Sequence, residues 1–229
     1  MCIPQIVGIT RMKLNTRKEK LVLLQQFVNL ETNELKEDNN PGNVLYDKIL
    51  CKKQLDKHIN NCTRCKDLNI KSFTDSVPGW GNLNADIFFI GESPCVHSMT
   101  AQFPFAWKSG RILDIVLYLS RLTRYDVFIS NSIHCHPESK RAPTDKEIHR
   151  CHKFLYKEIE IVQPELIVTL GNSAKTAMAH IIKRCYLPDD DGLDYKTIHK
   201  KHPAAFLYNS AGLRDYILKF SLDLNKVSK

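Results

Sequence analysis

Four short apolar segments, separated by helical patterns, constrain the fold of this 229-residue chain more than any other feature. The segments cover residues 86–90, 126–130, 165–170 and 195–199, and they are mostly apolar or β-branched rather than strictly alternating. Such strands are typical of a parallel sheet that is covered on both faces. The sequence therefore predicts an α/β fold with an open, mostly parallel four-stranded sheet flanked by helices.

Helical patterns follow these segments at residues 109–122, 144–162, 172–183 and 210–222. The second pattern begins with a capping box, in which the side chains of Thr144 and Glu147 each satisfy a free backbone N–H. Strands and helices that alternate with short connections indicate right-handed crossovers.

Residues 1–44 differ from the rest of the chain. They are charged, contain one amphipathic pattern at about 16–27, and end in a loop-like stretch, so we interpret them as an N-terminal extension. Residues 45–229, which open with a helical pattern at 45–60, form the main domain.

The composition of the chain restricts its expected binding partners and its expected cellular compartment. The formal net charge of +8 favours a polyanionic partner such as nucleic acid. No apolar run is long enough for a membrane helix, and the first residues do not resemble a signal peptide, so we expect a cytoplasmic protein that is neither secreted nor bound to a membrane. In a reducing compartment, eight cysteines are better explained as metal ligands or reactive thiols than as disulfides.

Polar residues follow each of the four predicted strands. The stretches are 91–94, 131–134, 171–174 and 200–203, and they include Glu92, Asn131 and His202. Taken singly, each residue has a structural explanation: a solvated carboxylate, a turn amide or a structural histidine. Because ligands bind outside the carboxyl ends of strands in open α/β sheets, the four stretches together predict a reaction site at this edge.

The cysteine spacing gives a second signal. Cys62 and Cys65 form a CxxC pair with two residues between them, and Cys135 and Cys151 follow the second predicted strand. We interpret these four as metal ligands, and Cys2, Cys51 and Cys185 as small buried side chains. Four thiolates suit zinc or an iron–sulfur cluster, and the spacing does not decide between them.

The motifs resemble those of the family 4 uracil-DNA glycosylases over about residues 45–218. The family pattern Gly-Glu-Ala-Pro-Gly corresponds to Gly91-Glu-Ser-Pro-Cys95, and its Pro-Phe-Val-Gly corresponds to Pro104-Phe-Ala-Trp107. A second block, Thr-Asn-x-x-Lys-Cys-Arg-Pro, corresponds to Ser130-Asn-Ser-Ile-His-Cys-His-Pro137, and the third, His-Pro-Ser/Ala, corresponds to His202-Pro-Ala204.

This resemblance implies a three-layer sandwich and a DNA glycosylase that hydrolyses the N-glycosidic bond of uracil, or of a related modified pyrimidine, to leave an abasic site for base-excision repair. It implies that Glu92 and His202 are catalytic and that Gly91, Phe105 and Asn131 bind the base. It further implies a [4Fe-4S] cluster with a structural role on Cys62, Cys65, Cys135 and Cys151, with zinc as the alternative. The expected partner is DNA that contains the target base, and the expected state is a monomer.

Four positions depart from the family pattern. Ser98 and Met99 replace an acidic pair, while Cys95 and Trp107 replace glycines. A pocket altered in this way predicts either another target base or a protein that keeps the fold and the cluster but only binds DNA. A zinc-stabilised nucleotide hydrolase is a third hypothesis.

The residues after His202 have two interpretations. Phe206 and Leu207 either wedge into the DNA stack or belong to the core.

Overall fold

The computed structural model describes residues 41–185 and 195–227. Backbone contacts divide the chain into Met1–Asp47 and Lys48–Lys229, and all the features below belong to the second unit except the first residues of helix α2. The helix predicted at about 16–27 lies outside the described residues, and the boundary between residues 44 and 45 stays a prediction.

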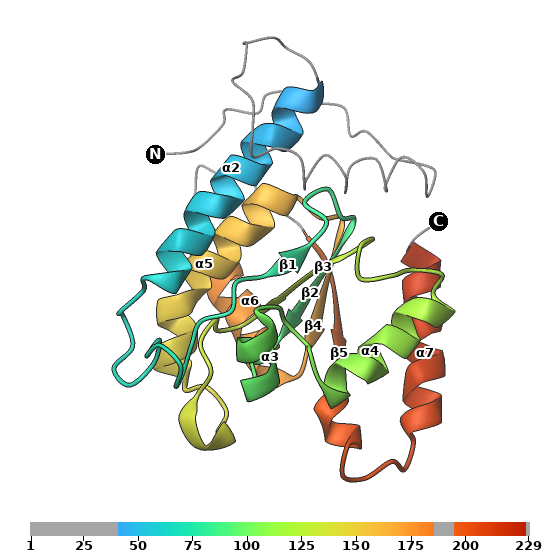
Figure 1. Ribbon diagram of the computed structural model, residues 1–229. Coiled ribbons are helices and arrows are strands. Elements are labelled where there is room, and N and C mark those ends of the chain that lie inside the picture. Colours follow the sequence, from blue (N-terminus) through green and yellow to red (C-terminus); the bar gives the residue numbers. More distant parts are fainter. Residues whose placement is uncertain (1–40, 186–194, 228–229) are drawn as a thin grey trace. The chain divides into compact units, whose positions relative to one another are not determined.

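A five-stranded sheet with the order β1-β3-β2-β4-β5 forms the centre (Figure 1). Its strands are β1 (Trp80–Gly81), β2 (Ile87–Gly91), β3 (Phe128–Asn131), β4 (Leu166–Leu170) and β5 (Lys196–Lys200). The four predicted strands are confirmed and are mutually parallel. The two-residue β1, which pairs antiparallel with β3, was not predicted because its sequence is a turn-rich stretch of glycine, proline and asparagine.

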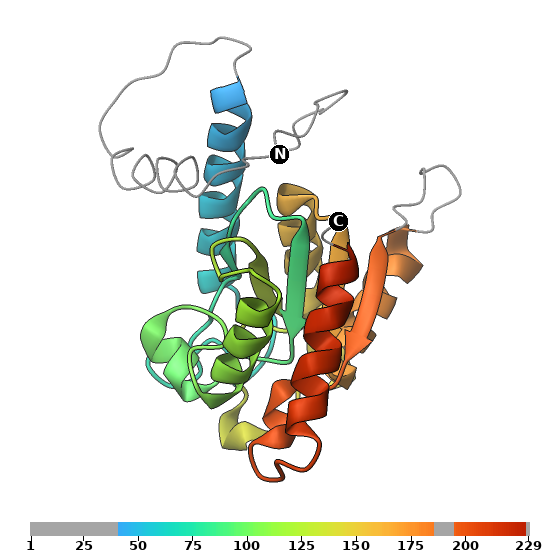
Figure 2. The same cartoon turned by 90° about the vertical axis from the view of Figure 1, so that its right-hand side faces the viewer.

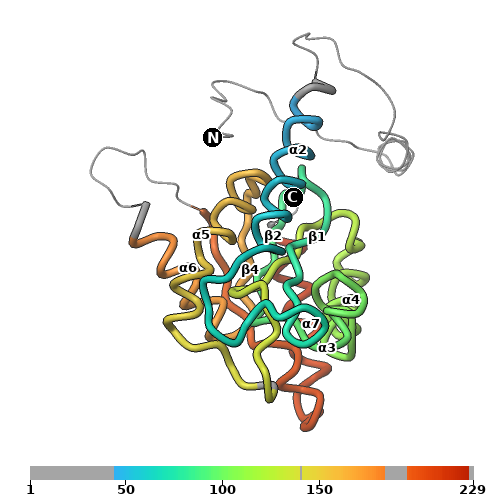
Figure 3. Tube along the Cα trace, turned by 60° about the vertical axis from the view of Figure 1, so that its left-hand side comes forward, coloured from blue at the N-terminus to red at the C-terminus, as the bar shows by residue number. Residues whose placement is uncertain are grey.

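Helices cover both faces of this sheet, as the sandwich prediction required. They are α2 (Pro41–Asn60), α3 (Val96–Ala101), α4 (Lys108–Leu119), α5 (Asp145–Val162), α6 (Asn172–Cys185) and α7 (Leu213–Val227), with 3₁₀ turns η1 (Glu138–Lys140) and η2 (Pro203–Phe206). Helices α4 and α7 lie together on one face (Figure 2). Helices α5 and α6 pack together on the other, and the second half of α2 lies beside α5 (Figure 3).

The strands are buried on both faces, which explains their continuous apolar sequence. Successive side chains of a strand point to opposite faces. In β2, Phe89 belongs to the core under α4 and α7, while Phe88 stacks on Phe128 with ring centroids 5.0 Å apart. Each fully buried phenylalanine of this kind contributes about 1.5–3 kcal/mol to stability.

The capping box at the start of α5 is confirmed. The Thr144 hydroxyl accepts from the Glu147 backbone N–H, and the Glu147 carboxylate accepts from the Thr144 N–H at 2.7 Å. This fixes the first turn of the helix that carries Cys151.

The strand order determines where a ligand can bind. The chain leaves β2 through α4 toward β3, whereas it leaves β4 through α6 toward β5, on the opposite side. The crevice between the carboxyl ends of β2 and β4 is therefore the topological switch point of the sheet.

Candidate functional site

Glu92 and Ser173 meet across the switch point. Glu92 follows β2, Ser173 lies in the first turn of α6 after β4, and the Ser173 hydroxyl donates to Glu92 Oε2 at 2.9 Å. The backbone carbonyl of Glu92 accepts from the Ser132 hydroxyl and from the Ile133 N–H. The backbone of Glu92 is therefore held from the end of β3, and its carboxylate from the residues after β4.

Gly91, Phe105 and Asn131 converge beside this carboxylate. A Cβ atom at Gly91 would lie 2.4 Å from Asn131 Oδ1 and 2.5 Å from Phe105 Cε2. These distances are far below van der Waals contact, so only glycine allows the amide and the ring to approach the strand end this closely. The structure thus brings together the three residues that the sequence predicted to bind a base.

Asn131 is buried, and its side-chain amide has a free donor. Its exposed fraction is 2%, and within the described residues no atom accepts a hydrogen bond from Nδ2. A buried donor without an acceptor costs about 1–3 kcal/mol. An orphan of this kind at a strand end indicates a ligand that supplies the missing acceptor.

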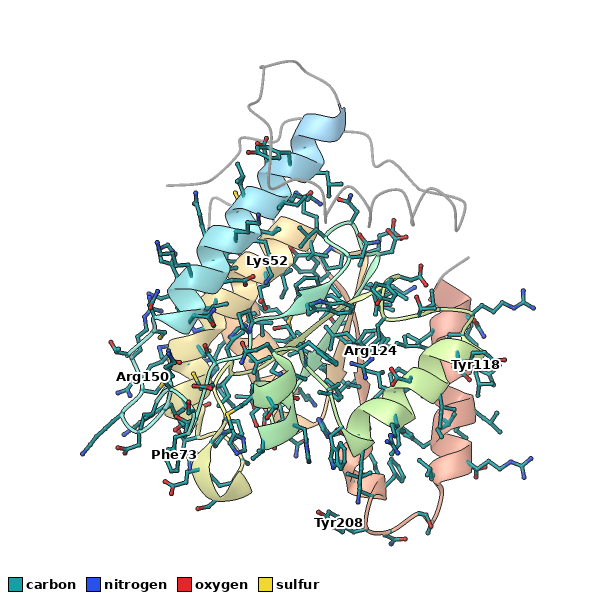
Figure 4. The ribbon with its side chains drawn as sticks, viewed as in Figure 1. Lys52, Phe73, Tyr118, Arg124, Arg150 and Tyr208 are labelled. Atoms are coloured by element: carbon teal, nitrogen blue, oxygen red, sulfur yellow. The ribbon has the colours of Figure 1, made fainter. Side chains whose placement is uncertain are left out.

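Phe105 is held in a strained backbone conformation. Its φ of 55° lies in the left-handed region, which bulky residues rarely adopt. The Arg124 guanidinium donates to the Pro104 and Phe105 carbonyls at 3.0 and 2.8 Å, and pairs with Asp114 (Figure 4). Gly110 leaves the room that this requires, because a Cβ there would lie 1.7 Å from the Phe105 carbonyl oxygen.

His202 packs against Phe105 and is kept neutral. Its ring is stacked on the Phe105 ring with centroids 5.4 Å apart. Burial lowers the pKa of His202 from 6.5 to about 4. Because Nδ1 accepts from the Ala204 N–H at 3.2 Å, the neutral ring carries its proton on Nε2, which is then a hydrogen-bond donor.

The residues that depart from the family pattern lie in the loop between β2 and α4. Trp107 is 42% exposed and stacks on His97 with centroids 3.8 Å apart, so its side chain lies on the surface. Ser98 is buried, where its hydroxyl accepts from the Ala106 N–H and lies 3.5 Å from Cys95 Sγ. Met99 is partly buried.

The four cysteines predicted to bind a metal line one pocket. They are Cys62 and Cys65 in the loop after α2, Cys135 after β3, and Cys151 on α5. Arg64 and Arg150 line the same pocket. The Asn69 amide donates to the Cys62 carbonyl at 2.7 Å and so holds the loop against the end of α2.

The chemistry of this pocket suits a metal cofactor that binds thiolates. Burial raises the pKa of Cys135, and its neighbours Cys151, Cys62 and Cys65 raise it further. A bound cation would relieve this repulsion between thiolates. Among residues 41–185 and 195–227, no three histidine, cysteine, aspartate or glutamate side chains are grouped closely enough to hold a single metal ion.

Comparison with known proteins agrees with this architecture and site. The model of the Uracil DNA glycosylase superfamily matches residues 78–225, which include both parallel strand ends of the switch point and His202. The chain therefore belongs to the uracil DNA glycosylase superfamily.

Curated relatives place it in one branch of that superfamily. It is 33% identical to a type-4 uracil-DNA glycosylase of Archaeoglobus fulgidus over 70% of this chain and 85% of the relative. It is 31% identical to one of Saccharolobus solfataricus (66% of this chain, 74% of the relative) and 37% identical to one of Thermotoga maritima (52% and 60%). These relatives are all type-4 enzymes, so the chain belongs to the type-4 branch. A helix long and apolar enough to cross a bilayer is absent from the described part of the chain.

The structure also contains site residues that the sequence analysis did not single out. Ser173 lies in a stretch that the strand-end rule had marked, but only the structure shows that it bonds Glu92. Arg124 had no signal, because it follows α4 by several residues and acts on a backbone carbonyl.

The stretch after His202 contains both packed and exposed residues. Phe206 packs on Tyr216 with centroids 4.5 Å apart, which favours the core interpretation for this residue. Leu207 and Tyr208 are 37% and 97% exposed, and Tyr208 points away from the ribbon (Figure 4).

Proposed function

We propose that this chain is a uracil-DNA glycosylase, which hydrolyses the N-glycosidic bond of uracil in DNA and leaves an abasic site for base-excision repair. The observation that carries the proposal is the buried, unpaired amide donor of Asn131 beside Gly91 and Phe105. Five relatives at 28–37% identity that are described as type-4 uracil-DNA glycosylases support the same activity.

Asn131 recognises the base after the nucleotide has left the DNA duplex. Its Nδ2 donates to uracil O4, and its Oδ1 accepts from uracil N3–H. Cytosine has a donor at position 4 and an acceptor at N3, so it mismatches both contacts. Phe105 contacts the face of the base, and its strained backbone holds the ring in place before the substrate arrives.

Cleavage separates a uracil anion from an oxocarbenium-like sugar. The Nε2–H of neutral His202 donates to uracil O2, where negative charge develops as the bond between N1 and C1′ breaks. The Glu92 carboxylate, held by Ser173, orients the water whose oxygen bonds to C1′. The water gives up a proton, and the uracil anion takes one from solvent after it leaves.

A [4Fe-4S] cluster held by Cys62, Cys65, Cys135 and Cys151 completes the proposal. These residues would hold it from the loop after α2, the loop after β3 and helix α5, where it would cross-link the three segments and have a structural role. The shared pocket and the crowding of thiols support this assignment.

The charged surface and a cytoplasmic location are both consistent with the proposed activity on DNA. A net charge of +8 favours binding to the phosphates of DNA, and Leu207 and Tyr208 are exposed beside the site where they can contact the base stack. A thiolate-bound cluster suits a reducing cytoplasm. The monomeric state stays a prediction.

The test uses cluster-loaded protein and oligonucleotides that carry one uracil, cytosine or thymine, with alkali cleavage of abasic sites. We expect cleavage of the uracil strand alone. Asn131→Ala, Glu92→Ala and His202→Ala each lower the single-turnover rate by about a hundredfold or more. Asn225→Ala, on helix α7 away from the switch point, serves as the matched control and leaves the rate unchanged.

A loaded protein that neither cleaves nor binds uracil DNA would contradict the proposal. Binding without cleavage would instead support the binding-only alternative, which the comparisons do not favour. Metal analysis of the same sample separates the cofactor hypotheses, since iron with sulfide supports the cluster and zinc without iron supports the third hypothesis.

A further inference from the structure

A buried line of side chains leads from the interior of the domain to the sulfur of Cys151. His134 Nδ1 lies 3.2 Å from Cys151 Sγ, and His134 Nε2 lies 3.0 Å from Glu158 Oε2. The His134 and Glu158 side chains are 1% and 0% exposed. We call these three residues the Glu158–His134–Cys151 network.

Glu158 is fixed by more partners than an ordinary buried ion pair. Its carboxylate accepts from the Gly79 N–H at 2.7 Å and from the Ser130 hydroxyl, and Lys52 Nζ lies 3.7 Å away (Figure 4). Glycine at position 79 is required for this approach, because a Cβ there would lie 2.7 Å from Glu158 Oε1. A buried carboxylate is tolerated only when it is paired in this way, so the orientation of His134 is determined as well.

The network connects segments that are distant in the sequence and that both supply cysteines to the pocket. Cys151 and Glu158 are seven residues apart, which places them two turns apart on one face of α5. His134 precedes Cys135 in the loop after β3. The imidazole therefore ties the helix that carries one predicted ligand to the loop that carries another.

We propose that Glu158 and His134 are positioning residues for the cofactor: the carboxylate orients the imidazole, and the imidazole holds Cys151 Sγ toward the pocket. The inference rests on the cluster assignment made above. Partners behind a metal ligand fix its direction, and hydrogen bonds to ligand sulfur adjust the reduction potential of iron–sulfur clusters. An ion pair that only stabilised the fold would have neither effect.

The test compares anaerobically reconstituted wild type with Glu158→Gln and His134→Gln. Iron and sulfide per chain, the rate of iron release to a chelator, and the reduction potential are measured on protein whose circular dichroism shows that it is folded. Each variant should release iron about tenfold faster or more and shift the potential. Ser120→Ala is the matched control, because it removes a buried hydroxyl that donates to the Val116 and Ser221 carbonyls on the side of α4 and α7 and contacts neither His134 nor Cys151, and it should release iron at the wild-type rate.

A second measurement needs no variant, which protects the test if a variant fails to fold. Pulsed electron paramagnetic resonance of the paramagnetic cluster, with ¹⁵N-labelled histidine, should detect coupling to one imidazole nitrogen. Release rates equal to the control, or an absence of nitrogen coupling, would overturn the network's role while leaving the glycosylase intact. A wild type that excises uracil without iron would overturn the cofactor assignment and this inference together.

Discussion

At the scale of single residues, Gly91 is the position at which the Asn131 amide and the Phe105 ring approach the end of β2. We expect Gly91→Ala to lower the rate of uracil release by about tenfold or more, because the new Cβ must displace either the Asn131 amide or the Phe105 ring from contacts of 2.4 and 2.5 Å. Single-turnover assays measure the effect, and thermal unfolding checks that the fold is retained. Unchanged excision would mean that the amide and the ring do not need this geometry.

His202 provides a prediction about pH. Burial lowers the pKa of His202 from 6.5 to about 4, so between these values the unfolded chain binds a proton at this residue and the folded chain does not. The free energy of unfolding should therefore decrease as the pH falls through this window, and His202→Gln should reduce that decrease.

Nuclear magnetic resonance of ¹⁵N-labelled histidine rings checks this directly. The ring that disappears in His202→Gln should titrate near pH 4 in wild type. A midpoint near 6.5 would show that the ring is hydrated and would weaken its assignment as a neutral donor.

At the scale of elements, the start of α5 supports the cysteine pocket. Thr144→Ala removes the N-cap and should lower the free energy of unfolding by about 1 kcal/mol in urea titrations. Thr100→Ala, whose exposed hydroxyl bonds only a carbonyl of its own short helix, is the control and should change stability by less than about 0.5 kcal/mol. Equal changes in stability for the two variants would mean that water satisfies the backbone N–H group that Thr144 caps in the wild type.

The elements were predictable to the extent that their signals are local. Continuous apolar runs and the Thr144 capping box lie within a few residues of sequence, and the structure confirms both. The strain at Phe105 was not predictable, because it depends on Arg124, nineteen residues away, and on the space above Gly110. The surface position of Trp107 likewise depends on its partner His97, which no periodicity reveals.

At the scale of the whole molecule, the four cysteines come from segments that only the fold brings together. Cys62 and Cys65 lie in the loop after α2, Cys135 follows β3, and Cys151 belongs to α5, so a bound cluster closes long loops of chain. A cofactor that binds the folded state stabilises it by mass action. Removing it should therefore loosen these segments first and leave the face formed by α4 and α7 largely unchanged.

Hydrogen exchange measured by mass spectrometry on the loaded wild type and on Cys65→Ser tests this division of the molecule. We expect faster exchange in the variant at residues 61–75, at residues 131–137 and in the first half of α5. Peptides from α4 and α7, whose core contacts come from β2 and β4 rather than from the cysteine loops, are the internal control. Uniformly faster exchange would mean that the domain unfolds as one unit without its cofactor, and unchanged exchange would mean that the pocket is held by protein contacts alone. Faster exchange confined to these segments would show that the strand end at Asn131, which we propose reads the base and which lies four residues before Cys135, depends on the proposed cluster for its rigidity.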